Sequence, residues 1–69
     1  MFTQEQKFVV VRTQGQGKFP LTRYSLVEIL PNGRERSASR KAFEEADFAV
    51  NYATNFGAEY DNIDLSRVQ

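Results

Sequence analysis

Residues 39–57, SRKAFEEADFAVNYATNFG, decide the fold, because their apolar side chains recur with a helical period. The alanines recur at steps of three and four residues, flanked by larger apolar side chains: Ala42, Ala46, Ala49 and Ala53, with Phe43, Val50 and Phe56. Ser37 or Ser39 can cap the start of a helix, and Gly57 stands where a glycine commonly ends one. We therefore predict a helix over about residues 40–56, roughly 25 Å long. Its small side chains let the helix axis come close to a sheet.

The chain before this helix predicts three strands. Residues 7–13 are rich in β-branched side chains and lead into a glycine-containing loop, and residues 21–30 form a second apolar run. The sequence PNG follows at 31–33, and Asn-Gly favours a type I′ hairpin turn with positive φ at both central residues. Residues 34–38, RERSA, then form a third strand that pairs with the second. Their charges suit the edge of a sheet.

The segment after the helix predicts a fourth strand. Ile63 and Leu65 have strand spacing, so we expect a short strand around residues 62–66 that joins the sheet. The predicted fold class is α+β: a three-stranded antiparallel meander packed by one long helix, with a short C-terminal strand, in the order β-β-β-α-β. We expect one small domain over residues 1–69, with frayed ends at 1–6 and 66–69.

The predicted core lies between the helix and the sheet. It comprises Val9, Val11, Leu26, Ile29, Ala42, Phe43, Ala46, Ala49, Val50, Ala53 and Phe56. Leu26 and Val27 are both apolar and point to opposite faces of the second strand. The sequence therefore leaves open which of the two faces the helix.

The composition argues against several kinds of site. The chain has no cysteine and no histidine, which removes disulfides, zinc–thiolate sites and the commonest general base. A core of this size yields only about 3–5 kcal/mol, which leaves little for a strained catalytic pocket. The GQGK stretch at 15–18 does not open a helix as a phosphate-binding loop does, and Glu59, Asp61 and Asp64 lack the spacing of a calcium loop. We therefore expect no enzyme activity, no cofactor and no metal.

Targeting signals are also missing from the pattern. No apolar run approaches the roughly 18 residues of a membrane-spanning helix, and the first residues lack the features of a signal peptide. We expect a cytoplasmic protein without a membrane partner.

The formal net charge of zero conceals an uneven distribution. Residues 1–43 carry eight basic and three acidic groups, a net charge of +5, whereas residues 44–69 carry one basic and six acidic groups, a net charge of −5. If the two halves separate in space, the folded domain has oppositely charged regions. The alternative is that they neutralise each other across a small fold.

Phe48 and Tyr52 form the first candidate site. They are four residues apart, are neighbours on the helix surface, and lie roughly opposite Phe43 and Val50. With Glu45 they predict a protein-binding surface that has an aromatic centre and a polar rim. The alternative is that the C-terminal segment folds back and covers both rings.

The second candidate site is the basic stretch between the third strand and the helix. Arg34, Arg36, Arg40 and Lys41 are predicted to cluster there, with the last two in the first helical turn. Four phosphate contacts would give duplex DNA binding a log–log salt slope of about −3 to −4. The alternative is an architectural role, in which these cations pair with Glu35, Glu44 or Glu45, and Arg40 contacts Glu44 one turn along the helix.

The sequence favours a small non-enzymatic protein-binding module, an adaptor or inhibitor that acts by occupying a surface on another protein. Free-standing domains of this size and organisation often have such roles in phage and other mobile elements, an analogy from fold class alone. A nucleic-acid-binding domain that uses residues 34–41 is the alternative. A homodimer formed through an edge strand or the two rings is a related hypothesis.

Overall fold

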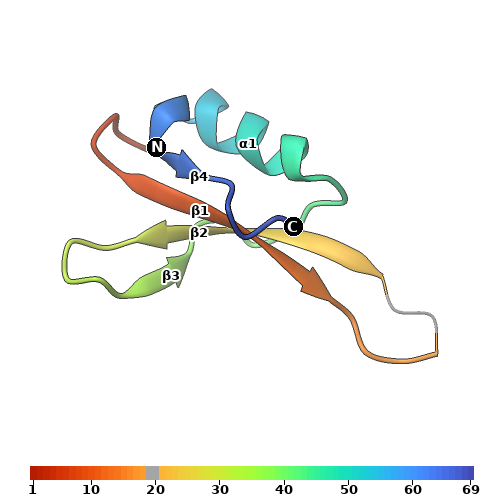
Figure 1. Cartoon of the computed structure of the whole chain (residues 1–69). Helices are drawn as coiled ribbons and strands as arrows, with labels where there is room; N and C mark the ends of the chain where they lie inside the picture. Colours follow the sequence, from red (N-terminus) through yellow and green to blue (C-terminus); the bar gives the residue numbers. More distant parts are fainter. Residues whose placement is uncertain (19–20) are drawn as a thin grey trace.

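The computed structural model describes residues 1–18 and 21–69, and these form a four-stranded mixed sheet with one helix. The elements in chain order are β1 (Lys7–Gln14), β2 (Thr22–Ile29), β3 (Glu35–Ser37), α1 (Ala46–Asn55), a 3-10 turn η1 (Tyr60–Asn62) and β4 (Ile63–Asp64). The strand order is β3-β2-β1-β4; β2 pairs antiparallel with β1 and β3, and β4 pairs parallel with β1. Figure 1 shows α1 on one side of the sheet and no helix on the other. The predicted α+β meander with one helix and a C-terminal strand is confirmed, and β3 lies at an edge as predicted.

The core lies between α1 and the sheet. Ala49 and Ala53 are fully buried, so the small-residue spine of the helix does lie against the strands. The sheet contributes large side chains, and the chain after the helix closes the layer; the buried cluster is Phe8, Val10, Leu26, Ala49, Val50, Ala53, Ala58 and Ile63. Ala46 and Phe43 pack against it from the side, as half-buried residues.

The parity of β1 differs from the prediction. Phe8 and Val10 face the helix, because Val10 stands opposite Leu26 and both belong to the buried cluster. Val9 is buried as predicted but lies on the other face of the sheet, and Val11 and Ile29 are half-buried there rather than in the core. The sequence Val9-Val10-Val11 is apolar in both parities, so alternation alone could not choose between them.

The start of the helix also differs from the prediction: α1 begins at Ala46, not near residue 40. The preceding segment runs instead along the edge of β2, where the amide of Ala38 donates to Leu26 O and the amides of Phe43 and Tyr24 donate to each other's carbonyls, at 2.7 and 2.8 Å. β3 is too short to pair with this part of β2, so the segment satisfies backbone groups that a helix would leave unpaired. Ala42, predicted in the core, is exposed as a result.

Neither predicted serine caps the helix. The hydroxyl of Ser37 donates to Ser39 O at 2.6 Å, and that of Ser39 donates to Lys41 O at 2.8 Å. The N-cap position belongs to Glu45, whose backbone is extended and whose side chain makes no capping hydrogen bond. The two serines therefore stabilise the connecting loop instead.

The turn between β2 and β3 is not type I′. No residue other than glycine has positive φ among the described residues, which excludes that turn at Asn32; Gly33 alone adopts φ +85°. The amide of Gly33 donates to Leu30 O at 2.9 Å, with Pro31 at the second position of the turn. Proline has a fixed φ that suits this position of an ordinary turn, so the turn spans residues 30–33, one residue earlier than the predicted turn with Asn32 and Gly33 at its centre.

The end of the helix follows the prediction in one respect and departs from it in another. Gly57 has φ +107°, the positive φ of a glycine after the helix, as predicted. Phe56, predicted in the core, is 47% exposed. Its carbonyl accepts a 2.7 Å hydrogen bond from the amide of Phe2, which holds the N-terminal segment beside the end of α1.

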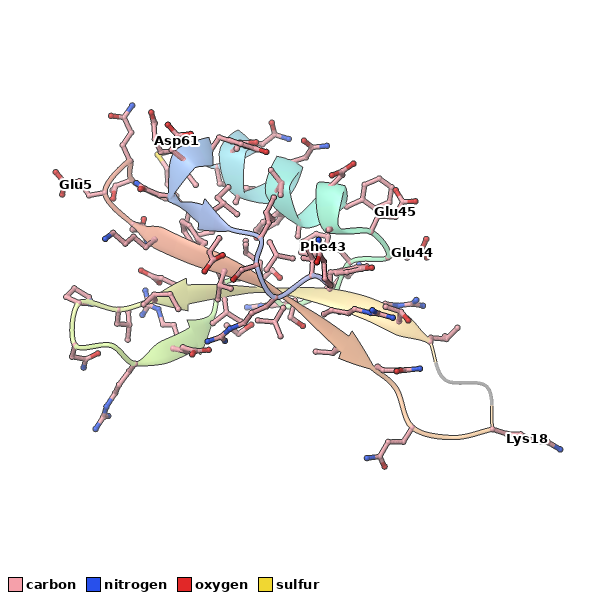
Figure 2. All side chains as sticks on the ribbon, in the orientation of Figure 1. Glu5, Lys18, Phe43, Glu44, Glu45 and Asp61 are labelled. Carbon is pink, nitrogen blue, oxygen red and sulfur yellow. The ribbon has the colours of Figure 1, made fainter. Side chains whose placement is uncertain are left out.

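The charges of the two halves of the chain are separated in space only in part. Figure 2 shows Glu44 and Glu45 beside the first turn of α1 and Asp61 beyond its other end, whereas Lys18 stands at the far tip of the β1–β2 hairpin. Arg40 and Lys41 nevertheless precede Glu44 and Glu45 closely and are exposed, so charges of both signs occur beside the helix. No helix within the described ranges combines the length and the apolar character that crossing a bilayer requires.

Candidate binding groove

Five aromatic rings form one connected cluster on the flank of α1. Tyr52 is in its middle, with ring centroids 4.8 Å from Phe56, 5.5 Å from Phe43 and 6.2 Å from Phe2. Phe2 also packs on Phe8 at 4.7 Å, which ties the cluster to the buried core. The tilted ring pairs are those that aromatic quadrupoles favour. Tyr52 is thus held in place by neighbours from both ends of the helix.

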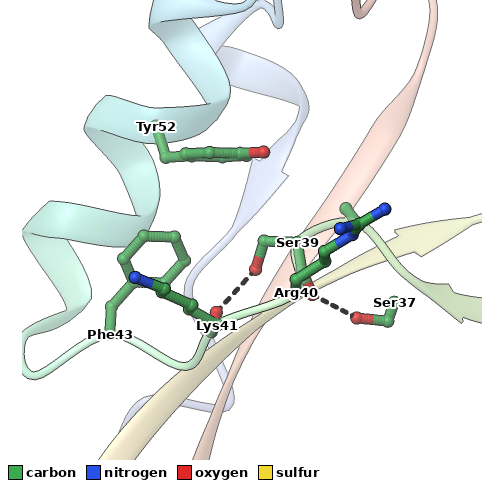
Figure 3. A pocket seen from close by; sticks show the side chains of 7 residues that line it. Ser37, Ser39, Arg40, Lys41, Phe43 and Tyr52 are labelled. Atoms are coloured by element: carbon green, nitrogen blue, oxygen red, sulfur yellow. Dashed lines mark hydrogen bonds between the residues drawn. The ribbon is translucent and has the colours of Figure 1, made fainter.

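An open groove of about 800 Å³ lies between this cluster and the loop that precedes α1. The rings of Phe43 and Tyr52 are the apolar part of its lining, and Figure 3 shows Arg40 and Lys41 on the loop that also carries Phe43. The remaining lining residues are Ser37, Ala38 and Ser39. The groove therefore joins two aromatic rings to two cationic side chains.

The position of the two cations follows from the loop, not from a helix. Because residues 38–43 run along β2, Arg40 and Lys41 do not occupy the first helical turn, contrary to the prediction. Both are exposed. Within residues 1–18 and 21–69 the ion pairs are Arg36–Glu28 and Arg67–Glu35, so the predicted contact between Arg40 and Glu44 is not formed. The charges of Arg40 and Lys41 therefore remain available to a ligand.

The predicted aromatic pair does not stay together as a pair. Phe48 is 49% exposed, whereas Tyr52 is half-buried in the ring cluster. The C-terminal residues Leu65 and Val68 pack against the core, yet the rings that cover Tyr52 are those of the aromatic cluster. Phe48 precedes Tyr52 by one helical turn, but it is not among the residues that line the groove. Glu45 is exposed at the N-terminal end of that flank.

The other two predicted cations lie outside the groove. Arg34 is exposed in the turn before β3, where its amide donates to Asn32 Oδ1 at 2.9 Å. Arg36 donates through Nε to Glu28 Oε1 at 2.7 Å, and Gln6 Nε2 donates to the second carboxylate oxygen at 2.8 Å. The hydrogen bond from Gln6 and the bond and charge of Arg36 lower the pKa of Glu28, against the opposing effect of its burial. The charge of Arg36 is therefore partly neutralised within the fold.

Several residues of the groove and its surroundings are not among the predicted site residues. The sequence predicts Phe43 in the core, Ser37 or Ser39 as a helix cap, and Phe2 in a frayed end. Glu28 is not among the predicted site residues. It is two residues from Leu26 on the second strand, so both side chains point to the same face of the sheet, and this spacing could have indicated a carboxylate on the helix side. The groove depends on the path of residues 38–43, and no local pattern in the sequence specifies that path.

Comparison of the chain with protein-family models, with curated proteins and with solved structures gives no match.

Proposed function

We propose that the chain is a small non-enzymatic binding module that acts by occupying a surface on another protein. The observation that supports this proposal is the convergence of Phe43 and Tyr52 with Arg40 and Lys41 on one groove. An apolar centre with a charged rim is the usual organisation of protein contacts. Aromatic and arginine side chains also dominate the energetics of such contacts.

The groove favours one class of partner segment. Two unpaired cations attract carboxylates, and the two rings offer an apolar surface to an aromatic or aliphatic side chain. The ring of Phe48, exposed on α1 one turn before Tyr52, offers the same partner a further apolar contact outside the groove lining. We infer that the partner presents an acidic segment with at least one apolar anchor. Glu45 lies at the end of the same flank. It therefore repels a partner segment whose acidic side chains would lie next to Glu45.

A nucleic-acid partner is the second candidate, because the groove also suits a base stacked on a ring beside a phosphate. Three observations weigh against it. Arg36 already pairs with Glu28, and Glu44 and Glu45 follow the cationic loop directly. Only Arg40 and Lys41 of the four predicted cations line the groove. Single-stranded nucleic acid held by two such contacts would show a log–log salt slope of about −1.4.

The experiment uses the immobilised chain to capture proteins from a lysate of its native host, with groove and control variants in parallel. The groove variants are Phe48→Ala and the charge reversal Arg40→Glu with Lys41→Glu. The matched controls are Tyr60→Ala, an aromatic residue that is 61% exposed, and Arg34→Glu, an exposed cation outside the groove. Circular dichroism checks that each variant is folded.

We expect one captured protein to bind the native chain and both controls, and to bind each groove variant at least about tenfold more weakly in calorimetry. Equal capture by all variants contradicts the proposed groove. Retention of single-stranded DNA or RNA at low salt, lost with the charge reversal, would replace the protein partner with a nucleic acid.

A further inference from the structure

The β1–β2 hairpin extends past α1 as a two-stranded arm, at the end of the sheet away from β3 (Figure 1). The arm comprises residues 12–18 and 21–23. At its base, Tyr24 exchanges backbone hydrogen bonds with Phe43 on one edge, and the amide of Arg12 donates to Arg67 O at 3.2 Å on the other. Beyond this base, the hydrogen bonds of the described arm residues stay within the hairpin. The arm therefore projects from the packed core, and the molecule is elongated, with extents of 40, 25 and 21 Å.

One strand of the arm presents only polar groups to solvent. Residues 12–18, RTQGQGK, are all exposed, and each is either polar or glycine. On the other strand Thr22 and Arg23 are half-exposed. A surface that binds protein usually has an apolar or aromatic centre, which residues 12–18 lack. Contacts with nucleic acid are made instead by Arg, Lys, Thr and Gln side chains and by backbone amides, the groups that this strand offers.

The charge of the arm has a single sign. The sequence contains no acidic residue from Gln6 to Val27, a stretch with four basic residues, three of which belong to the arm: Arg12, Lys18 and Arg23. The ion pairs of the described residues, Arg36–Glu28 and Arg67–Glu35, use none of these three. Three cations without an acidic neighbour in their own hairpin attract an anionic partner.

The three cations are distributed around the arm. Arg12 has the parity of Val10, which faces α1, so Arg12 lies on the α1 side of the two strands. Arg23 has the opposite parity and lies on the other side. Figure 2 shows Lys18 at the far end of the hairpin. Positive charge therefore projects from both sides of the ribbon and from its end.

We propose that the arm binds duplex DNA by lying in the major groove, with Arg12, Lys18 and Arg23 against phosphates. The major groove is about 12 Å wide and about 8 Å deep, and it admits a two-stranded β-ribbon. Two paired strands are about 4.8 Å apart, so the ribbon and its side chains match that width. Phosphates border the groove on both sides, which suits cations on both sides of the ribbon.

The arm is a different surface from the binding groove, because none of its three cations lines the groove. The reasons against a nucleic acid in the groove do not apply to the arm. Arg36 is paired with Glu28, and Glu44 and Glu45 follow the cationic loop, whereas the arm has neither a paired cation nor an acid. With a protein on the groove and DNA on the arm, one molecule would link the two.

The experiment measures binding of the full chain to a fluorescently labelled duplex of about 20 base pairs by anisotropy, over a range of salt concentrations. We expect a Kd on the order of 10 µM at about 20 mM salt, and a log–log salt slope of about −2.7 for three phosphate contacts. Arg12→Gln, Lys18→Gln and Arg23→Gln should each weaken binding at least about tenfold and reduce the magnitude of the slope by about 0.9. Arg34→Gln is the matched control. It removes an exposed cation from the turn at the other end of β2 and should keep the native slope.

The same assay contains the results that overturn the proposal. Lys18 lies outside the strands, so Lys18→Gln keeps the test decisive if circular dichroism shows that Arg12→Gln or Arg23→Gln does not fold. Absence of binding at about 20 mM salt with up to about 300 µM protein overturns the proposal. Tighter binding to the single strand than to the duplex, or equal binding to polyglutamate, also overturns it, because neither probe has a groove for a ribbon. So does DNA binding that survives loss of the three arm cations but is lost with Arg40→Gln and Lys41→Gln, a result that would place the DNA on the binding groove.

Discussion

Gly57→Ala tests how the end of the helix holds the N-terminal segment. A Cβ atom at Gly57 would lie 2.6 Å from the carbonyl oxygen of Phe2, closer than real contacts allow, and φ at this position is +107°. The contacted atom belongs to the backbone, so it cannot move aside as a flexible side chain would. The substitution must therefore displace Phe2 or shift the end of α1.

The expected cost is the sum of a conformational part and a displacement part. An L-residue with positive φ costs about 1–2 kcal/mol. Displacement of Phe2 breaks its hydrogen bond to Phe56 O, worth about 1 kcal/mol, and removes a half-buried ring from the aromatic cluster, worth about 1–2 kcal/mol. We therefore expect Gly57→Ala to lower the free energy of unfolding by about 3–5 kcal/mol. A core of this size supplies about as much in total.

Gly33→Ala is the matched control. Gly33 also has positive φ, +85°, but a Cβ atom there would meet nothing within 4 Å. Gly33→Ala should therefore lower the free energy of unfolding only by the cost of positive φ, about 1–2 kcal/mol. Urea unfolding followed by far-UV circular dichroism gives both values, with a constant concentration of trimethylamine N-oxide to keep the weakest variant folded.

Removal of residues 1–2 provides the decisive comparison. Without Phe2 the added Cβ atom loses its 2.6 Å neighbour, so Gly57→Ala should then cost no more than Gly33→Ala. The two changes are predicted to be strongly non-additive, as expected for groups in contact. Equal costs of Gly57→Ala in the full and the shortened chain would refute the reasoning, as would equal costs of the two glycine substitutions in the full chain.

Two further predictions concern single acidic side chains. The pKa of Glu28 is lowered from its ordinary value of 4.5 in the folded state, so its contribution to stability is complete above about pH 4.5 and is lost as the pH falls through the lowered value. Glu28→Gln should therefore be about 1 kcal/mol less stable at neutral pH and should lose less stability than the native chain between about pH 6 and pH 3, as measured by urea unfolding; a parallel loss in both chains contradicts this. Glu45 occupies the N-cap position with extended backbone but no capping bond, so Glu45→Ser should stabilise the domain by about 0.5–1 kcal/mol, with Glu44→Ser as a control that changes it by less than about 0.5 kcal/mol. Thermal unfolding of both variants tests this, and no difference between them would count against the cap.

The sequence by itself determined the kinds of element and their order. β-branched runs, a glycine-containing turn and an alanine-rich helical stripe depend on local backbone preferences, which neighbouring residues impose on each other. The sequence predicts the two long strands at 7–13 and 21–30, and the structure has them at Lys7–Gln14 and Thr22–Ile29. The edge position of the charged third strand, the alanine spine at Ala49 and Ala53, and the glycine after the helix were readable in the same way.

The tertiary structure decided the path of residues 38–43, the parity of β1 and, with them, the candidate site. Local propensity favours a helix that starts near residue 40. The backbone groups of Ala38 and Phe43 instead form hydrogen bonds with the edge of β2, so α1 begins at Ala46. Three consecutive valines fit either face of a sheet, and only the packing of Phe8 and Val10 under α1 chose between them. Both choices depend on hydrogen bonds and contacts between residues far apart in the chain. For that reason the groove that brings Arg40 and Lys41 to Tyr52 exists only in the folded molecule.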